Sequence, residues 1–232
     1  MASFKNSSIS NYAIITAGGI GSRIQTKLPK QFVMLNGQPL LAHSIIQFYR
    51  FDPEINLYVT IPDEFIDNWY AQIQNYELPA HQIITGGTTR FHSVKNALEQ
   101  IHDQEGLIAV HDAARPMVSL DLMHNAFATA RKRGNAVPAT SVNSSIRQKE
   151  GKQWKPIDRN QLRIIQTPQV FNLQMLKRAY QVDHKSAFTD DATVYEANGN
   201  EITLLEGDQH NFKITTESDL ELANHLLQII DT

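Results

Sequence analysis

The sequence predicts an α/β protein with a doubly wound, mostly parallel sheet and a protruding β-hairpin arm. Short β-branched runs alternate along the chain with segments whose apolar residues recur at three- and four-residue spacing. This is the pattern of strands and helices in a parallel sheet. Of the 232 residues, 41% are hydrophobic and 19% are charged, which is enough for a sizeable core. No repeat or low-complexity tract divides the chain, so we expect one domain spanning residues 1–232.

The expected elements follow from these two periodicities. The strands are Tyr12–Thr16, Leu57–Ile61, Gln82–Thr85, Leu107–His111, Asn135–Ala139, Leu162–Gln166 and Glu201–Leu205. The helices are Leu40–Tyr49, Glu64–Asn75, Thr89–Ile101, Leu120–Arg133, Asn172–Asp183, Asp190–Ala197 and Glu217–Ile230. The last helix has the clearest pattern, because Thr216 can cap it and its apolar residues form one stripe. We expect this stripe to dock on the sheet.

Residues 141–159 break the alternation. The segment is polar, carries several Lys and Arg residues and turns at Glu150-Gly151, so it is predicted to be a β-hairpin. Such a hairpin has little apolar surface to bury against its own domain. It either extends into solvent or packs against another molecule, and we favour a partner subunit. The segment would then be the dimerisation arm of a homodimer, with Trp154 as the residue to be buried.

The composition excludes several classes of protein. The formal net charge of −3 gives no overall positive field, so we expect no nucleic acid or membrane partner. The absence of cysteine excludes disulfides, thiolate metal sites and cysteine nucleophiles, and it agrees with a reducing, cytoplasmic location. Residues 1–11 are polar, so we expect neither a signal peptide nor a membrane span.

The first predicted strand runs directly into a glycine-rich segment, Ala17-Gly18-Gly19-Ile20-Gly21-Ser22-Arg23, with Pro29-Lys30-Gln31 nearby. Glycines let the backbone approach a ligand closely and present N–H groups to phosphate oxygens at the carboxyl edge of a sheet. Arg23 and Lys30 add positive charge there, so we interpret the segment as a phosphate cradle. A tight turn followed by surface basic residues is the alternative. The segment matches neither a Walker loop nor the dinucleotide fingerprint.

Two further predicted strands end in chemically informative residues. Gly86-Gly87 precedes a helix start with Arg90 and Ser93, which can bind a base or a phosphate or can simply be a capped helix. His111-Asp112-Ala113-Ala114-Arg115 follows another strand and brings Asp112 to the edge of the first loop. An acidic residue beside a phosphate cradle suits Mg²⁺, although Asp112 as an ordinary helix N-cap is equally consistent with the sequence.

Taken together, the motifs resemble one family. They are the glycine segment with Pro29-Lys30-Gln31, then Gly86-Gly87-x-x-Arg90-x-x-Ser93-Val94, His111-Asp112-Ala113-Ala114-Arg115-Pro116, Asp158-Arg159-Asn160, Gln166-Thr167-Pro168-Gln169 and Thr189-Asp190-Asp191-Ala192. In order and spacing they look like the 2-C-methyl-D-erythritol 4-phosphate cytidylyltransferases, from about Tyr12 to the C-terminus. The resemblance implies a Rossmann-like nucleotidyltransferase fold, transfer of a cytidylyl group from CTP to a methylerythritol phosphate with release of pyrophosphate in the non-mevalonate isoprenoid route, and a homodimer with crossed arms.

The resemblance also implies a role for each matching residue. Arg23, Lys30, Arg159 and Lys213 would be catalytic, the first two by stabilising the phosphates of CTP. The nucleotide would be bound by Ala17, Gly18, Gly19, Gly21, Gly87, Arg90, Ser93 and Ala113. The sugar phosphate would be bound by Asp112, Arg115, Ser145, Arg159, Thr167, Thr189 and Lys213, with Asp112 also at the metal, Mg²⁺. Ser145 and Arg159 match arm positions that reach into the site of the partner subunit.

Two positions depart from the family pattern. Thr88 stands where an acidic residue is common, and Ser144-Ser145 stands where Asp-Thr is common. Ser145 keeps the hydroxyl that can bond a phosphate oxygen, whereas Ser144 cannot replace a carboxylate. The first change concerns the base pocket and the second concerns the geometry of the arm.

Two other functions remain open. A ribitol 5-phosphate cytidylyltransferase would share the glycine loop and Lys30, and a regulatory module could bind CTP without turnover. Asp112 with its neighbours and Arg159 favour methylerythritol as the acceptor. The set of cations argues against a binding module, because binding alone needs no stabilisation of a transition state.

The histidines are not assigned a role in the chemistry. His43, His92 and His124 fall on predicted helices without a second ligand at metal spacing, so we assign no zinc site. His111 should point away from Asp112 by strand alternation, and we interpret it as structural. Trp69 is expected on the apolar face of its helix.

Overall fold

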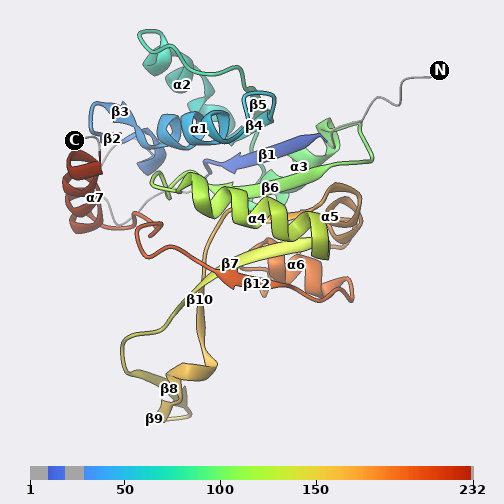
Figure 1. Ribbon diagram of the computed structural model, residues 1–232, viewed down its shortest axis with the longest axis vertical. Helices are drawn as coiled ribbons and strands as arrows, with labels where there is room; N and C mark the ends of the chain where they lie inside the picture. The colour runs from blue at the N-terminus through green and yellow to red at the C-terminus, as the bar shows by residue number, and fades with distance from the viewer. Residues whose placement is uncertain (1–9, 19–28, 231–232) are drawn as a thin grey trace.

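A computed structural model describes residues 10–18 and 29–230, and its centre is one large sheet (Figure 1). Within these residues, eight strands form the sheet in the order β10-β7-β11-β6-β1-β4-β5, with β12 paired to β7. The strands are β1 (Asn11–Thr16), β4 (Asn56–Ile61), β5 (Gln82–Thr85), β6 (Leu107–Asp112), β7 (Asn135–Ser141), β10 (Arg163–Ile165), β11 (Gln169–Asn172) and β12 (Leu204–Glu206). Strands β6, β1, β4 and β5 run parallel, which confirms the predicted fold class.

The two faces of the sheet are covered by different helices, because successive side chains of a strand point to opposite sides. Ala13 and Ile15 of β1 pack with α1 (Leu40–Phe51), α2 (Ile66–Ile73) and α4 (Leu120–Arg133). Tyr12 and Ile14 pack with α3 (Arg90–Gln100), α5 (Leu173–Ala179) and α6 (Asp191–Ala197) on the other face. Burial of a strand on both faces explains why its sequence is continuously apolar rather than alternating.

Strand β11 was not expected from the sequence. Residues 169–172 lie between β6 and β7 and run antiparallel to both. The sequence analysis placed Asn172 at the start of a helix, and the residue is in fact the N-cap of α5, accepting a hydrogen bond from the Met175 N–H at 3.1 Å. The sequence of this strand, Gln-Val-Phe-Asn, does not alternate between apolar and polar residues, so the strand is recognised only through its pairing with β6 and β7.

The other boundaries differ by a few residues. The predicted helix 64–75 is a short 3₁₀ turn, η2 (Asp63–Phe65), followed by α2, whose Trp69 is fully buried as expected. The predicted helix 172–183 ends at residue 179, and the predicted strand 201–205 is β12 at 204–206. A small hairpin, β2 (Met34–Leu35) and β3 (Gln38–Pro39), was missed, although Asn36-Gly37 at its turn is a strong local hairpin signal.

The prediction that the C-terminal helix docks on the sheet is wrong. Helix α7 (Glu217–Ile230) lies beside β2 and β3 at the edge of the molecule (Figure 1). Its Ala223 and Leu226 join a separate apolar cluster with Leu35, Met117 and Ile214. The predicted cap is confirmed, because Thr216 Oγ1 accepts a hydrogen bond from the Asp219 N–H at 3.2 Å. The helix thus anchors Ile214, which directly follows Lys213.

The predicted hairpin is confirmed as an arm that projects from the body (Figure 1). Its strands β8 (Ile146–Glu150) and β9 (Gln153–Ile157) pair antiparallel with each other in a sheet of their own. The turn uses Gly151 at φ 61°, a conformation that glycine adopts readily. Trp154 is 61% exposed on the arm.

The helices of the described residues are too short or too polar to span a membrane. Among residues 10–18 and 29–230, no helix combines the length and the apolar character that crossing a bilayer requires.

The N-cap of α4 can be tested by a single substitution. Ser119 Oγ accepts a hydrogen bond from the Leu122 N–H at 3.3 Å, and Ser119 lies outside the cavities described below. We expect Ser119→Ala to lower the free energy of unfolding by about 1 kcal/mol, because one N–H of the first turn loses its partner. Urea unfolding monitored by circular dichroism measures this change. An unchanged midpoint would show that the cap contributes nothing.

Candidate active site

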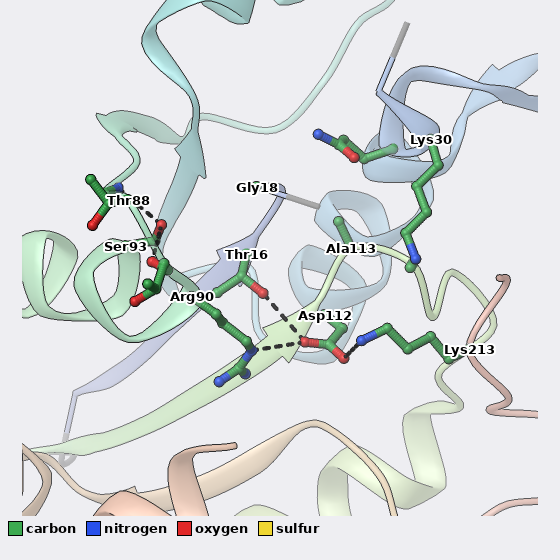
Figure 2. A pocket seen from close by; sticks show the side chains of 13 residues that line it. Thr16, Gly18, Lys30, Thr88, Arg90, Ser93, Asp112, Ala113 and Lys213 are labelled. Carbon is green, nitrogen blue, oxygen red and sulfur yellow. Dashed lines mark hydrogen bonds and ion pairs between the residues drawn. The ribbon is translucent and has the colours of Figure 1, made fainter. Parts of the chain in front are cut away.

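A cavity of about 270 Å³ opens at the carboxyl edge of β1, β5 and β6 (Figure 2). This is the edge at which doubly wound sheets bind ligands, because the loops that follow parallel strands converge there. Its walls come from the loops after β1, β5 and β6 and from the segment before α7. They consist of Thr16, Gly18, Lys30, Gln31, Gly87, Thr88, Thr89, Arg90, Ser93, Asp112, Ala113, Ala114 and Lys213.

A second cavity of about 210 Å³ adjoins the first. It is lined by Arg90, Asp112, Arg115, Ile165, Gln166, Thr167, Gln169, Thr189, Asp190 and Lys213. The sequence analysis assigned Arg115, Thr167, Thr189 and Lys213 to one substrate, and the structure brings these four residues together around this one cavity. Arg90, Asp112 and Lys213 line both cavities, so they mark the junction between two binding spaces.

Asp112 is the centre of that junction. Its Oδ2 lies 2.8 Å from Lys213 Nζ and 4.0 Å from Arg115 Nε, and its Oδ1 lies 3.2 Å from Arg90 Nε. Figure 2 shows Arg90, Thr16 and Lys213 converging on this carboxylate from different elements. Burial alone would raise the pKa of Asp112, but the positive charges of Arg90, Lys213 and Arg115 outweigh it and hold the pKa well below its usual range. The carboxylate is therefore ionised at neutral pH.

The alternative interpretation of Asp112 as a helix N-cap is wrong. Asp112 is the last residue of β6, and its carbonyl accepts a hydrogen bond from the Arg115 N–H in a turn. The next helix, α4, begins eight residues later and is capped by Ser119. The register of β6 against β1 pairs Asp112 with Thr16, which confirms that Asp112 lies at the same edge as the first loop.

The first loop is described only in part. Gly19, Gly21 and Arg23 lie outside the described residues, so their predicted roles are not addressed. Gly18 lines the first cavity. The expectation that Ala17 supplies a backbone donor is not met in this structure, because its N–H extends the pairing of β1 with β4 through the Thr60 carbonyl at 2.9 Å. The carbonyl of Ala17 accepts a hydrogen bond from the buried amide of Gln31.

Lys30 begins the 3₁₀ turn η1 (Lys30–Phe32) and lines the first cavity. Its Nζ donates to the carbonyl of Ile214 at 3.2 Å. Ile214 is fully buried and its N–H bonds the Ala114 carbonyl at 2.8 Å, so α7 and the loop after β6 hold this segment together. Two lysines, Lys30 and Lys213, thus reach the cavity from one locally rigid region.

The loop after β5 contains the N-cap of α3 and a hydrogen bond between Gly87 and Ser93. Thr89 is the N-cap of α3, and Ser93 Oγ accepts the Gly87 N–H at 3.0 Å and donates to the Thr89 carbonyl at 3.1 Å. Gly87 is required for steric reasons, because a Cβ there would lie 2.3 Å from the His92 Cβ. Both Gly87 and Ser93 line the cavity, but the hydrogen bond between them holds the loop closed in this structure.

Arg90 lines the first cavity and is also held by ion pairs within the protein. Its guanidinium lies between two carboxylates, with Nη2 at 2.7 Å from Asp191 Oδ2 and Nε at 3.2 Å from Asp112 Oδ1. Burial would lower the pKa of Arg90, but the charges of Asp191 and Asp112 raise it well above its usual range. A guanidinium committed to two carboxylates is a fixed charge rather than a mobile ligand.

His111 is structural, as the sequence analysis expected. It is fully buried, and burial lowers its pKa to about 4, so the ring is neutral. Its Nε2 lies 3.1 Å from the Arg115 carbonyl, which can only accept, and its Nδ1 lies 3.1 Å from Thr167 Oγ1. Thr167 Oγ1 accepts the Asp112 N–H at 3.0 Å and therefore donates its proton to Nδ1. This relay holds the loop that carries Asp112 and Arg115.

Ser145 and Arg159 lie on the arm and its base. Both are exposed, and Arg159 Nη1 donates to the Asn143 carbonyl at 2.6 Å. Within the described part of the chain, neither residue lines the two cavities of its own subunit. The arm follows the carboxyl end of β7 and projects from the body of the molecule (Figure 1).

Several residues at the site were missed by the sequence analysis. Thr16 lines the first cavity, with its Oγ1 at 3.4 Å from Asp112 Oδ1, and its position as the last residue of β1 could have signalled this. Asp191 was quoted in a motif without a role, and Tyr180 was not singled out. Their contact with each other and with Arg90 depends on how α5 and α6 pack, which no local pattern reveals.

Mg²⁺ fits this site as a metal held largely by substrate. In the ranges 10–18 and 29–230, no group of three or more His, Asp or Glu side chains could hold a metal ion. Mg²⁺ usually takes one or two carboxylates and completes its shell with phosphate oxygens and water. Asp112 supplies one such carboxylate at the junction of the cavities. Its oxygens would then bind the metal in addition to the nearby Arg90, Arg115 and Lys213.

The doubly wound sheet with two adjoining cavities at its carboxyl edge is the fold of an α/β nucleotidyltransferase, as the comparisons with known proteins show. A family model described as 2-C-methyl-D-erythritol 4-phosphate cytidylyltransferase (IspD) matches residues 11–229. The chain belongs to this family, as its motifs indicated.

Individual relatives agree. The chain is 38% identical over 220 residues to the 2-C-methyl-D-erythritol 4-phosphate cytidylyltransferase of Phocaeicola vulgatus, which covers 94% of this chain and 100% of the relative. The enzyme of the same name from Bacteroides fragilis is 39% identical over 216 residues, or 93% of this chain and 98% of the relative. These matches extend over nearly the whole of both proteins.

Solved structures match as well. The 2-C-methyl-D-erythritol 4-phosphate cytidylyltransferase of Thermus thermophilus superposes with a TM-score of 0.75 at 29% identity, covering 95% of this chain and 98% of that one. The bifunctional IspDF of Campylobacter jejuni gives a TM-score of 0.77 at 30% identity over 91% of this chain, but this chain spans only 53% of it. The fold is therefore shared with enzymes of this family.

The buried histidine makes stability depend on pH. His111 binds a proton near pH 4 in the folded protein, against about 6.5 when unfolded. The contribution of the neutral His111 to the free energy of unfolding is complete above pH 6.5. It is lost as the pH falls from 6.5 to 4, because the unfolded chain binds the proton in this range and the folded chain does not. We expect the stability advantage of the wild type over His111→Gln to shrink by about 3 kcal/mol between pH 7 and pH 4. Urea unfolding across this range measures it, and a constant advantage would contradict a neutral His111.

Proposed function

We propose that the chain transfers a cytidylyl group from CTP to 2-C-methyl-D-erythritol 4-phosphate and releases pyrophosphate. The observation that supports this most directly is the sharing of Arg90, Asp112 and Lys213 by two adjoining cavities. A transfer between two phosphates needs both substrates bound side by side across a cluster of fixed charges. The family match favours methylerythritol phosphate over ribitol phosphate as the acceptor.

CTP would occupy the first cavity and the sugar phosphate the second. An oxygen of the acceptor phosphate forms a bond to the α-phosphorus of CTP, and the bond from that phosphorus to the pyrophosphate oxygen breaks. The pyrophosphate leaves with the electron pair of that bond. No covalent intermediate with the protein is required.

The protein's part in this step is to fix positive charge where negative charge develops. Lys30 reaches the first cavity and Lys213 lies at the junction. Fixed cations stabilise the transition state more than the ground state, because negative charge grows on the α-phosphoryl group and the leaving pyrophosphate. Arg23, although outside the described residues, is proposed to act with them.

Asp112 would hold Mg²⁺ together with the phosphates of CTP. The metal, when bound, neutralises phosphate charge and so assists departure of pyrophosphate. Asp112 also holds Lys213 at 2.8 Å. The carboxylate therefore sets the position of a cation whether or not it also binds the metal.

The arm would complete the site of a partner subunit. Arg159 and Ser145 are exposed and line neither cavity of their own chain within the described residues. Trp154, exposed on the same arm, offers apolar surface for the partner. We propose a homodimer in which Arg159 binds phosphate across the interface.

The role of Lys30 can be tested by kinetics. We expect Lys30→Ala to lower kcat by about 100-fold or more with a smaller change in the KM for CTP, because the lost charge acts mainly on the transition state. Pyrophosphate release with CTP and the sugar phosphate measures this. Lys132→Ala, an exposed lysine of α4, is the matched control and should have no effect. Unchanged turnover would remove Lys30 from catalysis.

The metal requirement is tested by chelation. Activity should vanish with EDTA, because removal of the metal leaves the negative charge of the phosphates uncompensated. It should return when Mg²⁺ is added and compensates that charge again. The same pyrophosphate assay detects both steps. Full activity in the chelator would dispose of the metal role of Asp112.

The trans assignment of Arg159 is tested by mixing two inactive variants. In a mixed dimer of Arg159→Ala and Lys30→Ala chains, one site collects both lesions and the other has none. Random exchange makes about half of the dimers mixed, so about a quarter of wild-type activity should return. If Arg159 acted within its own subunit, every site would carry one lesion. Persistent inactivity after demonstrated subunit exchange would therefore exclude action in trans.

A further inference from the structure

Asp191 is a buried carboxylate that the chemistry above does not use. It is the first residue of α6 and has no exposed surface. Its Oδ1 accepts the Tyr180 hydroxyl at 2.6 Å, and its Oδ2 lies 2.7 Å from Arg90 Nη2. A buried charge is stable only when it is paired and hydrogen-bonded, and here each oxygen has one strong partner.

The first turn of α6 does not need Asp191 for its start. Asp190 is the N-cap, and its Oδ1 accepts the Thr193 N–H at 2.9 Å while the Thr193 hydroxyl accepts from the Asp190 N–H. This capping box satisfies the N–H groups of Asp190 and Thr193, and the Gln169 side chain accepts the Ala192 N–H at 2.8 Å, so none of these three groups depends on the Asp191 side chain. The side chain of Asp191 is directed instead toward Arg90, which lines both cavities.

Arg90 is held from both sides. Asp191 bonds the end of its guanidinium, and Asp112 bonds Nε at 3.2 Å. The ring of Tyr180 is stacked on Phe91 with centroids 4.8 Å apart, so the hydroxyl that fixes Asp191 is itself on a rigid support. The result is a continuous chain of contacts from Tyr180 through Asp191 and Arg90 to Asp112, part of which is visible in Figure 2.

We propose that Asp191 is a positioning residue for the transfer reaction, which holds the guanidinium of Arg90 so that Arg90 fixes Asp112 at the junction of the two cavities. This role rests on the proposed function. With Oδ1 of Asp112 held by Arg90, Oδ2 faces Lys213 at 2.8 Å. Without the charge of Asp191, Asp112 becomes the remaining carboxylate partner of Arg90 among the ion pairs of the described residues. The guanidinium can then turn about its long side chain and carry Asp112 with it.

The decisive experiment is a double-mutant cycle on kcat/KM. Asp191→Asn keeps the shape of the side chain and removes its charge, and we expect at least a tenfold loss of kcat/KM, mostly in kcat, because Asp191 lines neither cavity. In the Arg90→Ala background the same change should cost nothing further, since Asp191 acts only through Arg90. The double variant should also melt no lower than Arg90→Ala alone, because it lacks an unpaired buried carboxylate.

Controls separate positioning from folding. Ser119→Ala removes the N-cap of α4, lies in neither cavity lining, and should lower the melting temperature without changing kcat or KM. The proposal would be overturned if Asp191→Asn lowered kcat/KM by the same factor in the Arg90→Ala background as in the wild type. It would also be overturned if Asp191→Asn alone had the kcat/KM of the wild type. If Arg90→Ala is inactive, Arg90→Gln, which also removes the charge that pairs with Asp191, serves as the background with the same expectation.

A milder variant covers the case in which Asp191→Asn does not fold. Tyr180→Phe deletes only the hydroxyl that holds Asp191 and keeps the ring on Phe91. We expect a loss of kcat/KM of at least threefold that disappears in the Arg90→Gln background, whereas an unchanged kcat/KM would count against the proposal. The activity of the wild type shows whether the proposed function or only the role of Asp191 is wrong. A wild type that releases no pyrophosphate from CTP with the sugar phosphate refutes the proposed function, whereas an active wild type with additive losses refutes only the role of Asp191.

Discussion

The ion pairs around Asp112 are the interaction on which the rest of the site depends. One carboxylate at the end of β6 holds Lys213 at 2.8 Å and Arg90 at 3.2 Å, with Arg115 at 4.0 Å. Each cation comes from a different part of the chain, so Asp112 ties together α3, the loop after β6 and the segment before α7. Cations held in this way are already in place before substrate arrives, and preorganised charge is the main source of catalysis in phosphoryl transfer.

The surrounding fold supplies what this cluster needs. The parallel strands β1, β4, β5 and β6 bring their loops to one edge, and helices cover both faces of the sheet. The hydrogen bonds from Thr167 to His111 and from His111 to the Arg115 carbonyl fix the loop that carries Asp112. Helix α7, docked beside the β2–β3 hairpin, secures Ile214 and with it Lys213 and Lys30. The two cavities are thus separated only by the charged junction.

Much of this arrangement was predictable from local patterns. The order of strands and helices, the arm at 141–159, the positions of Asp112 and Gly87 after strands and the place of Lys30 beyond the glycine-rich segment all follow from periodicity and local motifs. The resemblance to the family added Thr167, Thr189 and Lys213, which the structure groups around one cavity. Strand β11 was not found, because its partners β6 and β7 lie far away in the sequence, whereas the β2–β3 hairpin was missed despite the turn signal at Asn36-Gly37.

The sequence by itself determined the fold class and the residue types at the carboxyl edge, since both arise from short-range periodicity and from strand ends that must meet in a parallel sheet. The tertiary structure alone decided which of these residues touch. Arg90 lines both cavities but is also paired with Asp112 and Asp191, and α7 packs on a separate cluster rather than on the sheet. Both outcomes depend on contacts between residues about 20 to about 190 positions apart, and packing and charge pairing at that range leave no periodic signal in the chain.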